Sequence, residues 1–366
     1  MTSFGPVLVR DEAVVTRIHC EYEDIQRVTA RSLRTGTEHK VVVYLALTGA
    51  VKPGDSILIN TAAVQLALGT GGADFAVCTG HTSTTSVPPG HIMKLRYTPQ
   101  QLPVLACEAQ ESPHHELMQK AVGLDDTPVV AVELHSQIAA ICHGIANTAP
   151  TEARVVFVMT DQAALPLAFS DLVRNLREEG LLAGTVTCGQ AFGGDLEAVS
   201  LFSGLLAAKA ILGAQFIIVG PGPGNVGTDT PYGFSAIDQG VALNAAASLG
   251  GTSVMCLRAG SEDARARHNG ISHHSLTVLS RVLLAPANIP VPHNYEEDSL
   301  RTTLNSAIVA HRLIPVDVEH LWETYLQRHP NIKSMGRSPQ QEPLLFKCAL
   351  AAGAWSASTS VERAVT

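Results

Sequence analysis

The densest polar chemistry in this sequence lies in one segment, residues 258–274, which holds three arginines, three histidines and two acidic residues. Guanidinium groups bind oxyanions through paired hydrogen bonds, and an imidazole exchanges a proton near neutral pH. We therefore expect Arg265 and Arg267 to neutralise a bound anion. We expect His268 or His273 to act as a general acid beside it.

The dipeptide His273-His274 begins a predicted helix for which Ser272 is a good N-cap residue. Neighbouring side chains on a helix point about 100° apart. The sequence therefore predicts that one of these two histidines faces the site, while the other packs or is solvated.

A glycine-rich loop, residues 220–230, is a second candidate element. Four glycines and two prolines occur within residues 220–227, which is more than a simple turn requires. Without a Cβ atom, backbone amides approach an anion closely, so Gly222, Gly224 and Gly227 are candidate ligands, together with Thr228. The loop is neither a Walker A sequence nor a dinucleotide-binding glycine motif that opens a helix directly.

Three more segments carry polar residues directly after predicted strands. We expect His135 to act as a general acid and Asp161 or Asp195 as a base or metal ligand, with the amides of Gly193 and Gly194 binding the anion. Each aspartate has a structural alternative, because each could cap the helix that follows it. These side chains suit a divalent metal, but no short histidine spacing ties them together, so the presence and identity of a metal stay open.

The elements that position these residues follow from the hydrophobic pattern after residue 100, where Val/Ile runs alternate with Ala/Leu-rich stretches. Strands are predicted over 104–107, 129–133, 155–159, 185–188, 216–219, 253–258 and 289–291, and helices over 138–147, 165–179, 196–212, 236–249 and 273–284. This alternation predicts an α/β fold with a mostly parallel, doubly wound sheet covered by helices on both faces. Ligands bind at the carboxyl ends of such strands, so five post-strand segments should converge on one rim.

The first hundred residues differ from the rest, because short strand-like runs alternate with Gly, Pro and Asp turns. The predicted strands cover 7–9, 13–17, 26–32, 40–47, 55–60 and 73–79, which is typical of a small β-barrel or β-roll. We therefore expect a small all-β domain over 1–100 and an α/β domain with the ligand site over 101–330. A C-terminal extension over 331–366 follows a predicted helix at 317–328 and is expected to be loose from 356 onward.

The amino-acid composition of the chain excludes some classes of protein. The chain has 366 residues with 25 Lys and Arg against 33 Asp and Glu, a net charge of −8, so we expect no nucleic-acid partner. Hydrophobic residues make up 46% and charged residues 16%, with a mean hydropathy of +0.17, which predicts a folded protein. Homo-oligomerisation stays open, because the apolar helices could form an interface.

The cysteines and the hydropathy pattern indicate where in the cell we expect the protein to be. The seven cysteines are scattered singly, without metal-site spacing, and are typical of reduced thiols in the cytoplasm. The amino-terminal residues lack the apolar core of a signal peptide. The apolar stretch over 201–219 is interrupted by Lys209 and Gln215, so we expect no membrane span.

Several of these segments together resemble a bacterial family of unknown function, number 3866 among the domains of unknown function. The matching segments are HIMKLRYTP (91–99), ELHS (133–136), MTD (159–161), AFGGDLEAV (191–199), GPG (220–222) with VGT (226–228), and SHH (272–274). The resemblance spans about residues 5–295 and implies neither substrate nor reaction. Two positions depart from the family pattern: Gln190 replaces a usual His, and Asp229 replaces a common Gly.

Two hypotheses follow. The first is an enzyme that binds a phosphorylated or nucleotide-like anion at the carboxyl rim of the sheet, as a hydrolase or a phosphoryl- or group-transfer enzyme. The second is a non-catalytic protein that senses a metabolite or binds a partner, because no complete catalytic motif is present. Convergence of His135, Asp161 and His268 in one cleft would favour the enzyme.

Overall fold

The computed structural model describes residues 10–80, 90–149, 152–260, 262, 265–293, 295 and 298–365. The chain divides into two compact units, 1–104 and 105–366. This division lies four residues beyond the domain boundary at residue 100 that the sequence predicts. The strand predicted over 7–9 lies outside the described residues.

The first unit contains a closed barrel of five strands in the order β1-β2-β3-β5-β4. The strands are β1 (Arg10–Glu21), β2 (Ile25–Ser32), β3 (Glu38–Tyr44), β4 (Ser56–Asn60) and β5 (Asp74–Thr79), with short helices α1 (Leu45–Thr48) and α2 (Ala62–Gln65). Alternate residues such as Ala13 and Val15, or Ile57 and Ile59, fill the interior. The predicted small β-barrel is confirmed. A separate two-stranded ribbon pairs β6 (Ile92–Lys94) with β7 (Leu102–Val104).

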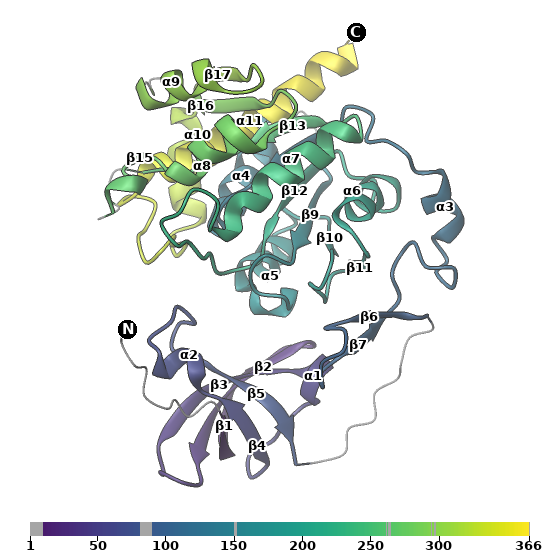
Figure 1. The fold of residues 1–366 in the computed structure, drawn as a ribbon, viewed down its shortest axis with the longest axis vertical. Coiled ribbons are helices and arrows are strands. Elements are labelled where there is room, and N and C mark those ends of the chain that lie inside the picture. Colours follow the sequence, from purple (N-terminus) through teal and green to yellow (C-terminus); the bar gives the residue numbers. More distant parts are fainter. Residues whose placement is uncertain are drawn as a thin grey trace. The chain divides into compact units, whose positions relative to one another are not determined.

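The second unit is built on an eight-stranded parallel sheet with the strand order β11-β10-β9-β12-β8-β13-β16-β17 (Figure 1). Its strands are β8 (Pro128–Ala131), β9 (Val155–Thr160), β10 (Gly184–Thr187), β11 (Leu196–Glu197), β12 (Phe216–Pro221), β13 (Thr252–Met255), β16 (Asn288–Pro292) and β17 (Arg312–Val316). This arrangement confirms the predicted α/β fold. The strands β11 and β17 at the two edges were not predicted.

Helices cover both faces of this sheet (Figure 1). One face carries α4 (Ile138–Thr148), α5 (Asp171–Glu178), α10 (Glu319–Arg328) and α11 (Pro343–Val365); the other carries α6 (Leu201–Ala210), α7 (Asp238–Ser248) and α9 (Asp298–Ser306). Successive side chains of a strand point to opposite faces of the sheet. In β8 and directly after it, Val129 and Ala131 belong to the core that includes α6 and α7, whereas Val130 and Val132 belong to the core that includes α4 and α11. Burial on both sides explains why these strands are continuous apolar runs.

The segment after β13 contains a short ribbon, β14 (Ala259–Gly260) with β15 (Gly270–Ile271), and then α8 (His273–Thr277). Helix α8 continues into a π-helical turn at Val278–Val282. Val278 and Leu279 pack in the same core as α7. The last remaining helix of this unit, α3 (His115–Lys120), precedes β8.

Two predicted helices begin later in the structure than in the sequence analysis. Helix α5 begins at Asp171, with the Ser170 side chain accepting a hydrogen bond from the amide of Val173. Helix α6 begins at Leu201 with Ser200 as its N-cap. The capping roles considered for Asp161 and Asp195 are therefore wrong, because serines closer to each helix accept from the first-turn amides.

The C-terminal segment also differs from expectation, because the tail expected to be loose continues as helix α11 to Val365. Helices α4 and α11 pack with their backbones in contact at two glycines. A Cβ atom on Gly144 would lie 2.6 Å from the carbonyl oxygen of Leu350, and one on Gly353 would overlap the backbone of Ile141. Ser356 and Ala357, the first two residues of this tail, are completely buried, so the tail begins within the core.

The strand order places a topological switch point at the carboxyl end of β8. The chain leaves β8 toward α4 on one face, whereas it leaves the two neighbouring strands, β12 and β13, toward α7 and α8 on the other. Loops that depart to opposite faces leave a crevice between them, and ligands of open α/β sheets bind in such crevices. The residues that follow β8 are therefore the centre of the candidate site.

In the described part of the chain, no helix combines the length and the apolar character that spanning a membrane requires.

Candidate functional site

The five post-strand segments converge on one rim, as the sequence predicts. All five strands are parallel neighbours, and hydrogen bonds join the segments to one another. The bonds link His135 Nδ1 to Pro221 O at 2.9 Å, Gln190 N to Asp161 Oδ2 at 2.9 Å, Ala164 N to Pro223 O at 3.1 Å, and Arg258 Nη1 to Glu133 Oε1 at 2.9 Å.

A buried polar network occupies the switch point. The carboxylate of Glu133, which is 1% exposed, accepts hydrogen bonds from Arg258 Nη1 at 2.9 Å and Ser275 Oγ at 3.0 Å. Nδ1 of His274 lies 2.9 Å from the same Oε1 atom. Burial opposes the ionisation of Glu133, but the hydrogen bonds and charges of His274 and Arg258 outweigh it and hold the pKa of this carboxyl below its usual value.

Three histidines surround the network on the side of α8. One ring nitrogen from each of His268, His273 and His274 lies within 4.8 Å of the others. The ring of His274 stacks on Phe234 with centroids 4.0 Å apart, and Nδ1 of His268 lies 2.9 Å from the hydroxyl of Ser272. Among the described residues, no other group of His, Cys, Asp and Glu is placed so that it could hold a metal ion.

The expectation that only one of His273 and His274 faces the site is wrong, because their ring centroids lie 4.3 Å apart within the same cluster. Both residues belong to the first turn of α8, and side chains lean toward the N-terminus of a helix. No preceding helical turn stands in their way there, so two rings that begin about 100° apart can meet beyond the helix end.

Two buried polar atoms, one within this cluster and one beside it, lack a hydrogen-bond partner in the described structure. Nε of Arg267 and Nε2 of His273 are buried and have no hydrogen-bond partner among the described residues. The guanidinium of Arg267 does contact Asp229 at 3.3 Å, and Arg267 is close enough to help lower the pKa of His273, to which burial contributes most. Buried atoms without partners are rare in folded proteins and call for an explanation.

The residue Asp229 is also unusual in its backbone, which has a φ of 62°. This left-handed conformation favours glycine, although aspartate and asparagine adopt it more readily than most other residues. Two positions earlier, a Cβ atom on Gly227 would lie 3.2 Å from the ring of His274. The glycine-rich loop therefore packs directly against the histidine cluster.

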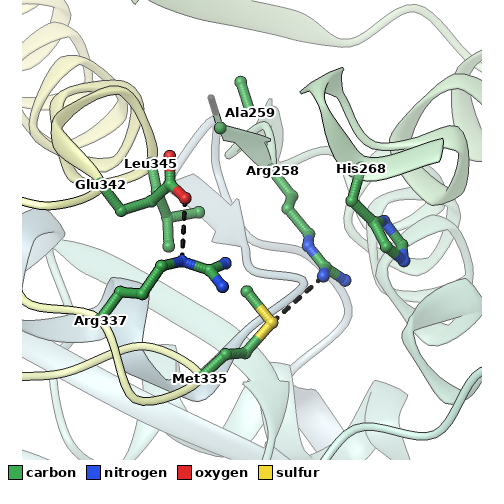
Figure 2. Close-up of a pocket in the computed structure, with 8 residues that line it drawn as sticks. Arg258, Ala259, His268, Met335, Arg337, Glu342 and Leu345 are labelled. Carbon is green, nitrogen blue, oxygen red and sulfur yellow. Dashed lines mark hydrogen bonds and ion pairs between the residues drawn. The ribbon is translucent and has the colours of Figure 1, made fainter. Parts of the chain in front are cut away.

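A small cavity, with room for about one water molecule, lies beside His268 (Figure 2). It is lined by Arg258, Ala259, Gly260, His268, Met335, Arg337, Glu342 and Leu345. Nη2 of Arg258 lies 3.2 Å from Met335 Sδ, and Arg337 pairs with the buried Glu342 at 3.0 Å. The segment before α11 and the start of that helix thus complete the wall of the site.

The predicted catalytic residue His135 is held by hydrogen bonds at both ring nitrogens. Its Nδ1 donates to Pro221 O at 2.9 Å, so Nε2 accepts the proton of Ser170 Oγ at 2.6 Å. Burial lowers the pKa of His135 to about 4, although the bond to Pro221 opposes this change. A neutral ring of this kind positions the loop after β8, and its one remaining proton, on Nδ1, is held by Pro221 O.

The predicted residue Asp161 lies at the carboxyl end of β9, where it accepts the amide of Gln190. It approaches Gly189 so closely that a side chain there would overlap its carboxylate. A second acid, Asp238 at the start of α7, lies nearby: burial raises the pKa of Asp238, and the charge of Asp161 raises it further. Two carboxyls therefore lie close together at this part of the rim.

The structure does not bring Asp195 to the rim. Strand β11 pairs with β10 in a register that places Asp195 beside Thr185, near the amino end of β10. The carboxylate accepts the amide of Thr185 at 2.8 Å and pairs with Arg177 at 2.8 Å. This aspartate fastens an edge strand to its neighbours.

The amides of Gly193 and Gly194 are used within the protein. That of Gly193 donates to a carboxylate oxygen of Glu197 at 2.7 Å, and that of Gly194 donates to Thr187 Oγ1 at 3.1 Å. A carboxylate of the chain itself therefore occupies the position that we expected for an external anion.

The predicted ligands in the glycine-rich loop have different surroundings. A Cβ atom on Gly222 would lie 2.5 Å from Ala164 O, so this glycine permits close contact with the loop after β9. Gly224 has a φ of 102° and open space around it. The hydroxyl of Thr228 donates to Gly233 O at 2.8 Å, which shapes the loop. The side chain of Arg265 lies 3.8 Å from Met335 Sδ, at the margin of the cavity.

Sequence reasoning missed several residues of the site. The sequence analysis includes Glu133 only as the last residue of the strand predicted over 129–133. A charged residue at the end of such an apolar run indicates a candidate site residue. Met335, Arg337 and Glu342 come from a segment assigned to an appendage, and no local pattern places them beside Arg258.

The fold and the site define a class: an α/β protein with an N-terminal closed β-barrel and a histidine- and arginine-rich rim at the switch point of its parallel sheet. The chain belongs to the family described as "Protein of unknown function (DUF3866)", whose model matches residues 40–353. The family resemblance read from the sequence motifs is thus confirmed. No curated protein matches the chain.

Proposed function

We propose that this protein is an enzyme that binds a small anionic molecule, phosphorylated or nucleotide-like, at the carboxyl end of β8. The reaction classes that fit are hydrolysis and phosphoryl or other group transfer. The observation that carries the proposal is the unpaired buried Nε atom of Arg267 beside the histidine cluster. A buried cationic N–H group that lacks a partner is strongly stabilised when an oxyanion accepts its hydrogen bond.

The surroundings of Arg267 support the same conclusion. The loop that contains Gly224 and Gly227 lies against the histidine cluster, and its open backbone at Gly224 leaves space for a ligand. The positive charge of Arg258 is balanced by Glu133, so Arg258 positions its neighbours, whereas the partner of Arg267 is the largely exposed Asp229. We therefore assign anion binding to Arg267 first, with Arg265 at the margin.

Acid–base chemistry is assigned to two parts of the rim. His268 and His273 remain the candidate proton donors, and Asp238, whose pKa is raised by burial, is a candidate acid beside Asp161. Hydrogen bonds tie His135 to Pro221 and Ser170, Asp161 to Gln190, and His268 to Ser272, and such separate settings are the arrangement expected of a binding protein. His274 and Glu133, however, do form an acid–base pair at 2.9 Å, and this favours the enzyme.

The alternative is a metabolite sensor that binds the same anion without turnover. Both hypotheses share the binding site, so binding is tested first and turnover second. We further propose a cytoplasmic location, supported by seven free thiols of which five are buried, and no nucleic-acid partner, supported by the net charge of −8.

The experiment is calorimetric titration of the intact chain with inorganic phosphate and with adenosine monophosphate. A charge-assisted hydrogen bond contributes about 1.5–3 kcal/mol, so Arg267→Ala should weaken binding by about tenfold or more. The matched control is Arg312→Ala, which removes an exposed arginine at the amino end of the edge strand β17 and should leave affinity unchanged.

Equal affinity of Arg267→Ala and the unsubstituted chain would overturn the assignment of the anion site. If both probes bind and neither phosphate-ester nor phosphodiester substrates are turned over, the sensor hypothesis replaces the enzyme.

A further inference from the structure

We propose that His268, His273 and His274 form a binding site for one divalent transition-metal ion, with zinc as the ion that the ligands fit best. This site shares its location with the proposed anion site, but it does not depend on which substrate that site takes. A ring that binds the ion no longer donates a proton, so water bound to the ion would take over the acid–base role proposed above for His268 and His273.

The first argument is the position of the ring nitrogens. Three imidazoles contribute nitrogen atoms within 4.8 Å of one another, which is close enough for all three to bind one ion. Nε2 of His273 is buried without a hydrogen-bond partner among the described residues. Coordination of a metal ion would supply the partner that this buried nitrogen otherwise lacks.

The second argument is the support behind the rings. Nδ1 of His274 lies 2.9 Å from Oε1 of Glu133, so this nitrogen is engaged by the carboxylate and Nε2 is the ring nitrogen left for a metal ion. Nδ1 of His268 lies 2.9 Å from Ser272 Oγ in the same manner. Metal-binding histidines almost always have such a partner on the second ring nitrogen, and carboxylates are the most common one.

The third argument concerns the identity of the ion. Magnesium and calcium prefer oxygen ligands, whereas neutral imidazoles suit zinc, cobalt, nickel and copper. Three protein ligands leave at least one coordination position for water or substrate, which is typical of catalytic rather than structural zinc. Arg267 and the glycine-rich loop both lie close to these rings, so an anion bound to the metal could also contact the guanidinium.

The test uses the full chain without a polyhistidine tag, stripped of metal with a chelator and titrated with Co²⁺. We expect one equivalent to bind, to produce the visible absorption of four- or five-coordinate cobalt, and to be displaced by zinc. His273→Ala should lower the affinity by about 100-fold or more, since loss of even a supporting residue costs 10- to 100-fold. This side chain is partly exposed, so the variant should fold.

Two further variants sharpen the result. His320→Ala removes an exposed histidine on α10 and should bind cobalt as the unsubstituted chain does. His273→Cys should retain the metal and add the near-ultraviolet charge-transfer band of a cobalt–thiolate bond, which identifies residue 273 as a ligand.

Failure of the stripped chain to bind cobalt or zinc, or equal binding by His273→Ala, would overturn the proposal. The result is independent of the anion site, because cobalt binding should survive Arg267→Ala, whereas phosphate binding should not. Loss of phosphate affinity in Arg267→Ala without any metal binding would leave the proposed function standing and this inference refuted.

Discussion

At the scale of single residues, the chemistry of the rim depends on one buried carboxylate. Glu133 directly follows the central strand of the sheet and holds Arg258, His274 and Ser275 in fixed positions. If Glu133 were neutral, the buried guanidinium of Arg258 would lose the carboxylate that balances its charge. A buried ion pair adds little net stability compared with apolar residues, but breaking one is costly.

We therefore predict that Glu133→Gln destabilises the protein by about 3–5 kcal/mol, as expected when one partner of a buried pair is removed. Urea unfolding followed by circular dichroism measures this change. The control is Glu319→Gln, which removes an exposed carboxylate that pairs with Lys347 and should cost less than about 1 kcal/mol. A loss below about 1 kcal/mol in Glu133→Gln would contradict the account of the network.

A second residue-scale prediction concerns the competition between Asp229 and a bound anion for Arg267. Asp229→Asn removes the charge but keeps a side chain that tolerates the left-handed backbone. Exposed ion pairs contribute at most about 1 kcal/mol, so phosphate affinity should rise by about two- to fivefold. Calorimetry with the same probe measures it, and weaker binding would show that Asp229 supports the ligand instead.

At the scale of elements, the rim is shaped by where helices begin and how closely they pack. The late start of α6 at Leu201 allows residues 189–195 to return along β10 and removes Asp195 from the site. On the other face, α4 follows β8 directly, and its contact with α11 fixes the direction in which the chain leaves the switch point. This contact requires glycine at two positions.

We predict that Gly353→Ala destabilises the α/β unit by about 1–3 kcal/mol or more, because the added methyl group would overlap the backbone of Ile141. Gly123→Ala is the matched control in the same unit, since its Cβ atom would lie 3.4 Å from the nearest atom, the carbonyl oxygen of Leu249. Chemical unfolding of both variants tests the difference. Equal stability of the two would show that α4 and α11 can separate without cost.

At the scale of the whole molecule, the sequence predicts the barrel, the parallel sheet and the convergence of polar segments at one edge. These follow from local patterns: alternation with period two in β1 to β5, continuous apolar runs in β8, β9 and β12, and the rule for open α/β sheets. The segment 258–274 stands out by composition alone.

The remaining features depend on tertiary contacts that no local pattern contains. The buried residues of α11 between Leu345 and Ala357 belong to the core because this helix packs against α4 at Gly144. The meeting of His273 with His274 depends on the first turn of α8, and Asp195 was misplaced because a two-residue strand precedes the helix. The cavity beside His268 joins residues about eighty positions apart, from Arg258 to Glu342.

A property of the whole chain follows from its buried neutral histidines. Burial lowers the pKa of His135 and of His143 to about 4, whereas both titrate near 6.5 in an unfolded chain. Between pH 6.5 and 4 the unfolded state binds more protons than the folded state, so the free energy of unfolding should fall as the pH is lowered through this range. Glu133 adds to the loss at the acidic end, because its folded pKa is also lowered.

Urea unfolding at pH 7.5, 6 and 5 tests this prediction. His143→Gln should show a shallower dependence on pH, because a glutamine amide can still reach Thr324 without titrating. Unfolding free energies that stay constant or rise toward pH 5 would contradict the assignment of neutral buried rings.

The most direct measurement of the central claim is a crystal structure of the untagged chain grown with inorganic phosphate and zinc, with anomalous data collected at the zinc edge. The account predicts a phosphate contacting Arg267 at the carboxyl end of β8, with the anomalous peak among His268, His273 and His274. A phosphate bound elsewhere on the chain, with Arg267 still paired only to Asp229, would contradict the proposed site.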